Sequence, residues 1–432
     1  MLSAVVVLAA VSSVPVELYS YLNRPDSSFS YSSLPNQRYE MVSQTWQGIQ
    51  LRHTISIVWP VKVSSRNTAV LVIQGGKVND ADQALAKEVA DKTGLPIVTL
   101  YDIPNQPLYG QTEDGLIAHT FQKYLETGDP TWPLLFPMAK SAIRAMDVVQ
   151  KATASASNPI NRFIVTGASK RGWTSWFVGA SRDKRVIGIA PLVIDNLNIP
   201  AQMKHQIASW GAYSEEIVDY TSRGLQDLLE TEKGKKLAEI VDPYSYRTSI
   251  KAPTLIVNGA NDPYWTVDAL NLYWDGLKQP KWVVYIPNQG HDASYSTDGL
   301  KAIGAFACMV ASGKRWPALQ WKLRGSTLSM SFGSQTLGAR LWVAESDTLD
   351  FRESVWKVAR SVALPSASYS LAVPASARNQ AYFGQVLVAS PVGAVGICTP
   401  MQVRKTQSKE ALKGRSQQSL RVELPFASKS AQ

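Results

Sequence analysis

Short apolar runs alternate with helical segments over the first 316 residues, and no other feature of the sequence limits the possible folds as strongly. The runs predicted to be buried strands are 69–74, 95–101, 162–166, 186–194, 253–258 and 282–286. Apolar residues at helical spacing predict helices at 81–92, 137–151, 267–277 and 300–311. Strands that are apolar throughout are typical of a parallel sheet, because helices cover both of its faces. The alternation therefore predicts an open α/β sheet with right-handed crossovers.

The pattern changes after Trp316, where short strand candidates follow one another without helices between them. Several alternate apolar and polar residues, and Gly, Pro, Ser and Asn separate them. They lie at 319–323, 327–332, 340–343, 355–361, 368–373 and 385–389. This spacing predicts a small β-sandwich at 317–400, appended to an α/β domain at 14–316.

The two ends of the chain differ from the rest in composition. Residues 1–13 are apolar and then small, like the core and cleavage site of a secretory signal peptide, although the basic start of such a peptide is missing. We expect a signal peptide and a secreted or extracytoplasmic protein; a buried first element is the alternative. Residues 401–432 carry seven Lys or Arg and two Glu, which supplies half of the net charge of +10. A solvated tail and a contact with an anionic surface are the two interpretations.

Composition excludes several classes of protein. With 45% apolar and 18% charged residues, the chain is not disordered throughout. Its two cysteines, Cys308 and Cys398, exclude a four-cysteine zinc module; unpaired buried thiols are expected, with a disulfide as the alternative. No cluster of His, Cys and carboxylates has the spacing of a metal site, so we expect neither metal nor cofactor. The sequence indicates neither a nucleic-acid module nor a transmembrane segment.

A serine lies in a tight turn between a predicted strand and a predicted helix. The turn is Gly167-Ala168-Ser169, and the helical segment begins at Lys170. A serine in such an elbow projects its hydroxyl above the sheet, where the next backbone N–H can stabilise an oxyanion. The sequence departs from G-x-S-x-G, because Arg171 takes the fifth position and glycine comes one residue later. A turn that only caps the helix is therefore the alternative.

The serine hydroxyl needs a base to become nucleophilic, and the chain has four histidines. His291 lies in a glycine-containing turn after the strand at 282–286, and Asp262 follows the strand at 253–258. The order Ser169, Asp262, His291 is that of α/β hydrolases, and all three would lie at the carboxyl edge of the sheet. We therefore expect a triad in which Ser169 attacks an ester or amide, His291 is the base and Asp262 orients it. The other histidines are expected to be structural or at the surface.

The turn after the strand at 69–74 contains Gly75 and Gly76, whose backbone can approach a tetrahedral intermediate closely. We expect the N–H groups of Gly76 and Lys170 to form the oxyanion site; a plain glycine turn is the alternative. If exposed, the side chains of Lys170 and Arg171 would favour an anionic group in a small-molecule or peptide substrate.

The chain contains several longer motifs: SQTW at 43–46, TEDG and its continuation at 112–147, VTGASKRGW at 165–173, LVIDNLN at 192–198 and VDPYSYR at 241–247. Together these motifs resemble those of the PhoPQ-activated pathogenicity-related protein family. The resemblance extends from about Val16 to the turn at His291 and is weaker in the β-rich end. The elbow G-A-S-K-R-G looks like the family's own form.

The resemblance implies an α/β-hydrolase fold in a family that includes secreted proliferation repressors, and it implies no substrate. The segment at about 196–250 would be a lid. Its aromatic residues and those of 104–137 are candidates for pocket walls, with a core role as the alternative. A second interpretation of the chain is a secreted signalling or binding protein that uses the hydrolase fold as a scaffold.

Overall fold

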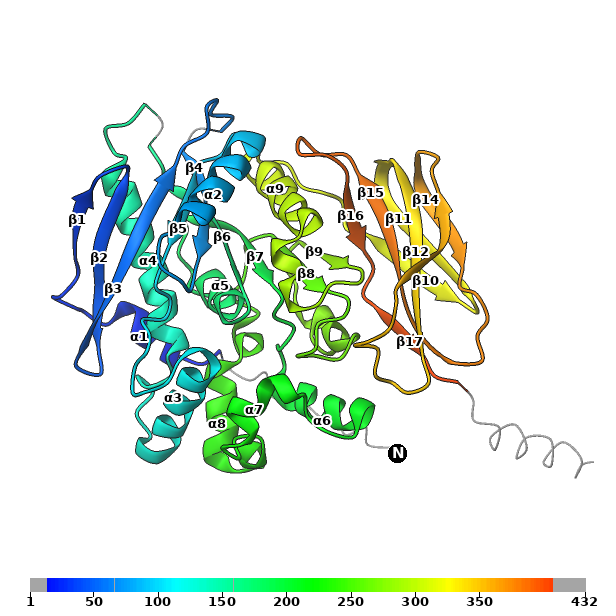
Figure 1. The fold of residues 1–432 in the computed structure, drawn as a ribbon, viewed down its shortest axis with the longest axis horizontal. Helices are drawn as coiled ribbons and strands as arrows, with labels where there is room; N and C mark the ends of the chain where they lie inside the picture. Colours follow the sequence, from blue (N-terminus) through cyan, green and yellow to red (C-terminus); the bar gives the residue numbers. More distant parts are fainter. Residues whose placement is uncertain (1–13, 66, 158, 407–432) are drawn as a thin grey trace, which may run out of the picture.

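The computed structural model describes residues 14–65, 67–157 and 159–406. The expected signal peptide at 1–13 and the basic residues beyond Thr406 lie outside the described residues. Figure 1 shows two neighbouring parts, a sheet flanked by helices and a part made of strands alone. Among the described residues, no helix combines the length and the hydropathy needed to cross a lipid bilayer.

Six parallel strands form the centre of the sheet, in the order β5, β4, β6, β7, β8, β9. Their bounds are β4 Thr68–Ile73, β5 Ile97–Leu100, β6 Arg162–Ala168, β7 Val186–Leu192, β8 Thr254–Gly259 and β9 Lys281–Ile286. Each agrees with a predicted strand to within two residues at either end. Antiparallel strands extend the sheet beyond β5: β1 Ser30–Leu34, β2 Arg38–Trp46 and β3 Ile49–Val58.

Helices cover both faces of the sheet, as the apolar strands predict. One face packs against α2 Asp80–Thr93 and α9 Thr297–Ala311, which also contact each other. The other face packs against α4 Leu135–Ala152 and α5 Lys170–Ala180, with α1 Glu17–Asn23 outside them. Neighbouring residues of one strand therefore belong to different apolar cores. Ile164 belongs to the α2–α9 core, and Phe163 and Val165 belong to the α4–α5 core.

The prediction of a helix at 267–277 is wrong. This segment forms two short 3-10 turns, η4 Ala269–Leu272 and η5 Trp274–Gly276. Side chains from elsewhere hold the carbonyls that a helix would use: Asn198 donates to Leu272 O at 2.8 Å, and Lys281 donates to Trp274 O at 2.5 Å. Tertiary contacts therefore override the helical spacing of the apolar residues.

The expected lid lies between β7 and β8. It contains α6 Ile199–Trp210, η1 Glu215–Ile217, α7 Val218–Thr221, η2 Asp227–Glu230, α8 Glu232–Val241 and η3 Pro243–Tyr246. α7 and α8 pack against α3 Glu113–Thr127, which lies in the other insertion. Figure 1 shows these helices grouped at one end of the sheet.

The β-rich part is a sandwich of two sheets, as predicted. One sheet contains β10 Gln320–Arg324, β11 Thr327–Thr336 and β14 Ser366–Ala372. The other contains β12 Gly338–Ser346, β13 Lys357–Val362, β15 Asn379–Val388, β16 Val395–Cys398 and β17 Gln402–Arg404. β16 pairs with β9 at Cys398 and Val283, so this sheet continues the central one.

The end of the sandwich differs from the predicted boundary at residue 400. β17 pairs with β15, so that Gln380 opposes Arg404 and Tyr382 opposes Gln402. Backbone pairing thus places 402–404 in the sandwich and not in a tail that starts at 401. Cys308 and Cys398 are free thiols, with Cys398 buried.

Candidate active site

Ser169 occupies a strained turn between β6 and α5. Its backbone has φ 57° and ψ −127°, a conformation that costs energy for any residue other than glycine. A methyl group on Gly167 would lie 2.8 Å from Arg171 Cβ, and one on Gly172 would lie 2.9 Å from Leu192 O. The two glycines therefore let α5 approach the sheet closely. The one-residue shift of the second glycine reflects the contact of Gly172 with the end of β7.

The structure pairs His291 with Asp262. His291 Nδ1 lies 2.9 Å from Asp262 Oδ2, and the backbone N–H of Tyr264 donates to Asp262 Oδ1 at 3.0 Å. The Tyr264 ring lies against the imidazole, with 4.2 Å between ring centroids. His291 Nε2 is buried and has no hydrogen-bond partner among the described residues. The ring is thus fixed by its Nδ1 side, and Nε2 remains available.

Ser169 and His291 line the same cavity, which has a volume of about 350 Å³. No hydrogen bond joins their side chains within the described part of the chain, a separation often found in hydrolases without substrate. From these two residues the cavity extends between the sheet and helices α2 and α9. Its walls are largely aliphatic, including Val72, Leu85, Val89, Ile97, Leu300 and Ile303.

The sandwich holds the loops that carry Asp262 and His291. Asn261 Nδ2 donates to the carbonyls of Arg352 at 2.9 Å and Ser354 at 2.8 Å. Asn288, on the His291 loop, exchanges two hydrogen bonds with the backbone of Trp356, at 2.7 and 3.0 Å. These contacts join residues far apart in the sequence, and no local pattern could have predicted them.

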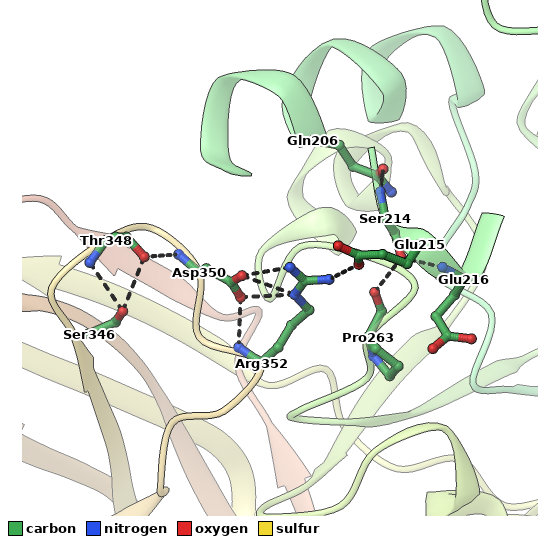
Figure 2. A network of polar contacts seen from close by, with 9 residues as sticks. All are labelled: Gln206, Ser214, Glu215, Glu216, Pro263, Ser346, Thr348, Asp350 and Arg352. Atoms are coloured by element: carbon green, nitrogen blue, oxygen red, sulfur yellow. Dashed lines mark hydrogen bonds and ion pairs between the residues drawn. The ribbon is translucent and has the colours of Figure 1, made fainter. Parts of the chain in front are cut away.

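The lid joins the same region through a network of polar side chains (Figure 2). Arg352 makes a two-pronged ion pair with Asp350 and reaches Glu215 of the lid at 2.8 Å. Ser214 Oγ donates to Pro263 O at 2.8 Å, next to Asp262. Lid, sandwich and Asp262 loop therefore meet at one place.

The basic side chains beside Ser169 are buried in ion pairs, so the exposure on which a preference for an anionic substrate group depends is not found. Lys170 Nζ lies 2.7 Å from Glu113 Oε2 and 3.1 Å from Asp114 Oδ2. Arg171 pairs with both Glu113 oxygens at 2.7 Å and donates to Ile103 O at 2.6 Å. The side chains of Lys170 and Arg171 are only 7% and 11% exposed. Both residues line the cavity, but the carboxylates of Glu113 and Asp114 neutralise their charges.

Glu113 completes this buried cluster. Burial opposes its ionisation, but the hydrogen bonds and charges of Arg171 and Lys170 hold the pKa of Glu113 well below its usual range. Gln106 makes two further hydrogen bonds with Glu113: its Nε2 donates to Glu113 Oε1 at 2.5 Å, and its Oε1 accepts from the backbone N–H of Glu113 at 2.8 Å. Through Glu113, the insertion at 104–137 therefore binds the first two residues of α5, directly after the elbow.

The expected oxyanion residues differ in their availability. Lys170 begins α5 directly after Ser169 and lines the cavity. The N–H of Gly75 is taken by its neighbour, Gln74 Oε1, at 3.0 Å, and a methyl group on Gly75 would overlap Arg171 Nη2. Gly76 N–H has no partner among the described residues, although Gln74, and not Gly76, lines the cavity. Gly75 thus makes room for Arg171, while Gly76 and Lys170 stay the predicted donors.

The remaining histidines lie away from the cavity. His53 is buried, its Nε2 is 3.0 Å from Ser43 Oγ, and burial lowers its pKa to about 4. His119 stacks on Tyr109, and His205 Nε2 lies 2.7 Å from Asp268. Asp195, which the sequence did not single out as a site residue, is buried and accepts a 2.5 Å hydrogen bond from Tyr273 Oη.

The aromatic residues of the two insertions do not wall the cavity at Ser169. Several surround a separate apolar space of about 100 Å³ under the lid, beside Trp173 and Trp265. Phe121 of one insertion and Tyr220 of the other line that space, whereas Phe136 and Tyr246 are fully buried. The core interpretation of these aromatic residues is the better one. Among the residues described, no group of three or more His, Cys, Asp or Glu side chains could hold a metal ion.

The chain is similar to a curated protein and to several solved structures. Autocrine proliferation repressor protein A of Dictyostelium discoideum is 29% identical over 377 residues, which is 81% of this chain and 74% of that protein. Among solved structures, acetyl xylan esterase from Paenibacillus sp. R4 is 16% identical, with a TM-score of 0.45, covering 63% of this chain and 86% of its own. Acetyl xylan esterase 1 from Thermoanaerobacterium sp. JW/SL YS485 is 14% identical, with a TM-score of 0.48, covering 69% and 95%.

The sequence pattern of one family spans most of the α/β part and reaches into the sandwich. It matches residues 19–352. The fold is that of the α/β hydrolases, as the order of strands and the position of the lid require. The chain belongs to the PhoPQ-activated pathogenicity-related protein family.

Proposed function

We propose that this protein is a serine hydrolase that cleaves an ester or amide bond through an acyl-enzyme. Ser169 is the nucleophile, His291 the general base and then acid, and Asp262 the residue that orients the imidazole. The observation that carries the proposal is the pairing of His291 with Asp262 at 2.9 Å, in which His291 lines the same cavity as Ser169. The Nε2 atom of His291 is buried and has no partner among the described residues, so it is suited to accept the proton of Ser169.

The chemistry proceeds in two balanced halves. Ser169 Oγ forms a bond to the carbonyl carbon while its proton passes to His291 Nε2, and the carbonyl oxygen becomes an oxyanion. The N–H of Lys170, with that of Gly76, stabilises this charge. The bond to the leaving group then breaks as His291 returns the proton to it. Water repeats the sequence on the acyl-enzyme and releases the acid and free Ser169.

Asp262 acts on orientation and charge. By accepting a hydrogen bond from Nδ1–H of His291, Asp262 selects the tautomer in which Nε2 carries no proton. Its charge also stabilises the imidazolium that forms during attack. The contact of the tilted Tyr264 ring with the imidazole restricts the histidine further. The side chains of Asn261 and Asn288, bonded to the sandwich, fix the two loops relative to each other.

Hydrolysis of p-nitrophenyl acetate tests the proposal. Ser169→Ala should abolish turnover above the background rate while its melting temperature stays within a few degrees of the wild type. Ser32→Ala, in the exposed strand β1, is the matched control and should keep full activity. Equal turnover in the folded Ser169→Ala protein would remove Ser169 from the nucleophile role.

A second candidate function is secreted signalling, with the protein acting outside the cytoplasm and the hydrolase fold serving as a scaffold. It is supported by the similarity to a protein named an autocrine proliferation repressor. A cell-proliferation assay with folded Ser169→Ala protein separates the two functions. Loss of the effect supports catalysis as the basis of signalling, and full retention supports the scaffold.

A further inference from the structure

We propose that the cavity beside Ser169 binds a linear, uncharged acyl chain of up to about ten carbon atoms. The enzyme would then prefer medium-chain acyl esters or amides to acetyl ones. This inference rests on the proposed function, because it names the substrate class of the same nucleophile.

The cavity leaves apolar side chains of the fold incompletely packed. Leu71 and Ile73 of β4 face α4 and α5 and are 0% and 2% exposed. Val72 faces the opposite way in the same central strand and is only half-buried. A central parallel strand is normally covered on both faces, so the open side of Val72 marks a space that the fold keeps free.

Helix α2 borders this space and shows the same feature. Leu85 and Val89, one turn apart, point into the cavity and are half-buried, while Ala86 is buried in its wall. Leu300 and Ile303 close the opposite side from α9. An unfilled space with these walls favours the hydrocarbon part of a ligand, because such a chain would remove the remaining apolar surface from water.

The size of the cavity sets the length of the chain. A water molecule takes about 30 Å³ of liquid volume, so 350 Å³ corresponds to roughly twelve groups of that size. A flexible chain leaves part of the space unfilled, so we expect its limit at about ten carbon atoms. The separate space under the lid has about 100 Å³ and is lined by none of the triad residues. The cavity that begins at Ser169 is therefore the one that can receive an acyl chain during attack.

The charges around the cavity favour a neutral chain. Lys170 and Arg171 line it near Ser169, but Glu113 and Asp114 neutralise them from the other side. Asp82 of α2 is the remaining acidic residue in the lining. Among the described lining residues, a carboxylate at the end of the acyl chain would thus find no unpaired lysine or arginine, and Asp82 would repel it.

A series of p-nitrophenyl esters tests the inference with the full-length protein. From acetate through butanoate to octanoate, kcat/KM should rise about four-fold per added methylene, equivalent to ~0.8 kcal/mol. The rise should level off or reverse at dodecanoate, because that chain exceeds the cavity. Octyl acetate compared with ethyl acetate tests the alcohol side, where we expect a much smaller gain.

Filling the cavity should remove the preference. In Ala86→Phe, the ratio of kcat/KM for octanoate to that for acetate should fall at least ten-fold. Ala84→Phe is the matched control, because Ala84 is exposed on the same helix, and its ratio should equal that of the wild type. Val89→Phe provides a second filling variant if Ala86→Phe does not fold, as judged by its melting transition.

The outcomes separate this inference from the proposed function. Acetate hydrolysis that depends on Ser169, without a gain with acyl length, would overturn the acyl cavity and leave the hydrolase. A gain that follows the alcohol chain, or a ratio unchanged in both filling variants, would also overturn it. Absence of all hydrolysis and of phosphonate labelling at Ser169 would overturn the hydrolase itself.

Discussion

Two apolar spaces lie near the carboxyl edge of the sheet, and they differ in composition and in neighbours. The space between the sheet, α2 and α9 is aliphatic, holds about 350 Å³ and touches Ser169 and His291. The space under the lid is bordered by Phe121, Trp173, Tyr220 and Trp265 and holds about 100 Å³. The comparison shows that aromatic density in an insertion marks the insertion's own core. The space proposed to receive the substrate is lined instead by aliphatic residues of the scaffold, several of them half-buried.

The two sides also use their polar groups differently. On the cavity side, His291 pairs with Asp262 through Nδ1, and its Nε2 has no hydrogen-bond partner among the described residues. On the lid side, His205 uses its Nε2 to bind Asp268 and leaves no such group for a substrate. We therefore propose that the His291–Asp262 pair orients a base, whereas the His205–Asp268 pair, at a similar distance, only joins two segments at the lid.

The largest expected effect separates these two histidines. His291→Ala should lower kcat for p-nitrophenyl acetate by about 10⁴-fold, a loss typical of removing a triad member. His205→Ala should keep kcat within about three-fold, because it disrupts only a lid contact. Steady-state kinetics on both purified variants measures the difference. Equal losses in the two variants would mean that His291 acts through stability and not through chemistry.

A smaller effect is expected from removing Glu113, and Glu215, which also pairs with an arginine, is its control. Glu113→Ala leaves Arg171 without a carboxylate and Lys170 with Asp114 alone. The free energy of unfolding should fall by about 2 kcal/mol, less than for a fully buried pair because Glu113 is partly exposed. Glu215→Ala, at the surface of the lid, should leave stability almost unchanged. Urea denaturation of both variants measures this, and equal stability would show that the elbow does not depend on Glu113.

The same ion pair predicts a pH dependence. The pKa of Glu113 is lower in the folded protein than in the unfolded chain, where a glutamate titrates near about 4.3. Its contribution to stability is therefore complete above that value and is lost as the pH falls below it. The difference in melting temperature between the wild type and Glu113→Gln should shrink between pH 6 and pH 3. A constant difference would contradict the charge-based role of Glu113.

The smallest effect concerns Asp195. Burial, with the charges of Asp262 and Asp268, raises the pKa of Asp195 to about 7, against the hydrogen bond from Tyr273. The folded state thus holds a proton that the unfolded chain loses near about pH 4, so stability falls as pH rises from about 4 to about 7. Asp195→Asn keeps an acceptor for Tyr273 and should show a smaller loss of melting temperature between pH 5 and pH 8.

Asp347→Asn is the control for this change, because Asp347 is exposed in the sandwich. Its melting temperature should follow the wild type at each pH. An unchanged pH dependence in Asp195→Asn would mean that Asp195 is ionised throughout the range.

Local patterns predict the parallel strands well. Apolar runs gave all six parallel strands, because burial on both faces leaves a continuous signal in the sequence. The helical spacing of apolar residues wrongly predicted a helix at 267–277, because the side chains of Asn198 and Lys281 donate hydrogen bonds to backbone carbonyls of that segment.

The environment of the proposed triad could not be predicted in the same way. Glu113, more than fifty residues away, pairs with both Lys170 and Arg171, and the burial of these two side chains could not be read from the local sequence. The cavity likewise depends on how closely α2 approaches the sheet. Tertiary packing, which a single sequence does not encode in any local window, decides both features.

The measurement that tests the central claim most directly is the site of covalent modification by an alkyl fluorophosphonate. Intact-mass analysis followed by peptide mapping should find one adduct, on Ser169, in the folded wild-type protein. The adduct should form faster with an octyl than with an ethyl phosphonate, and it should be absent in His291→Ala over the same time. An adduct at another residue, or an unmodified protein with a normal melting transition, would contradict a nucleophilic Ser169 at the mouth of an acyl cavity.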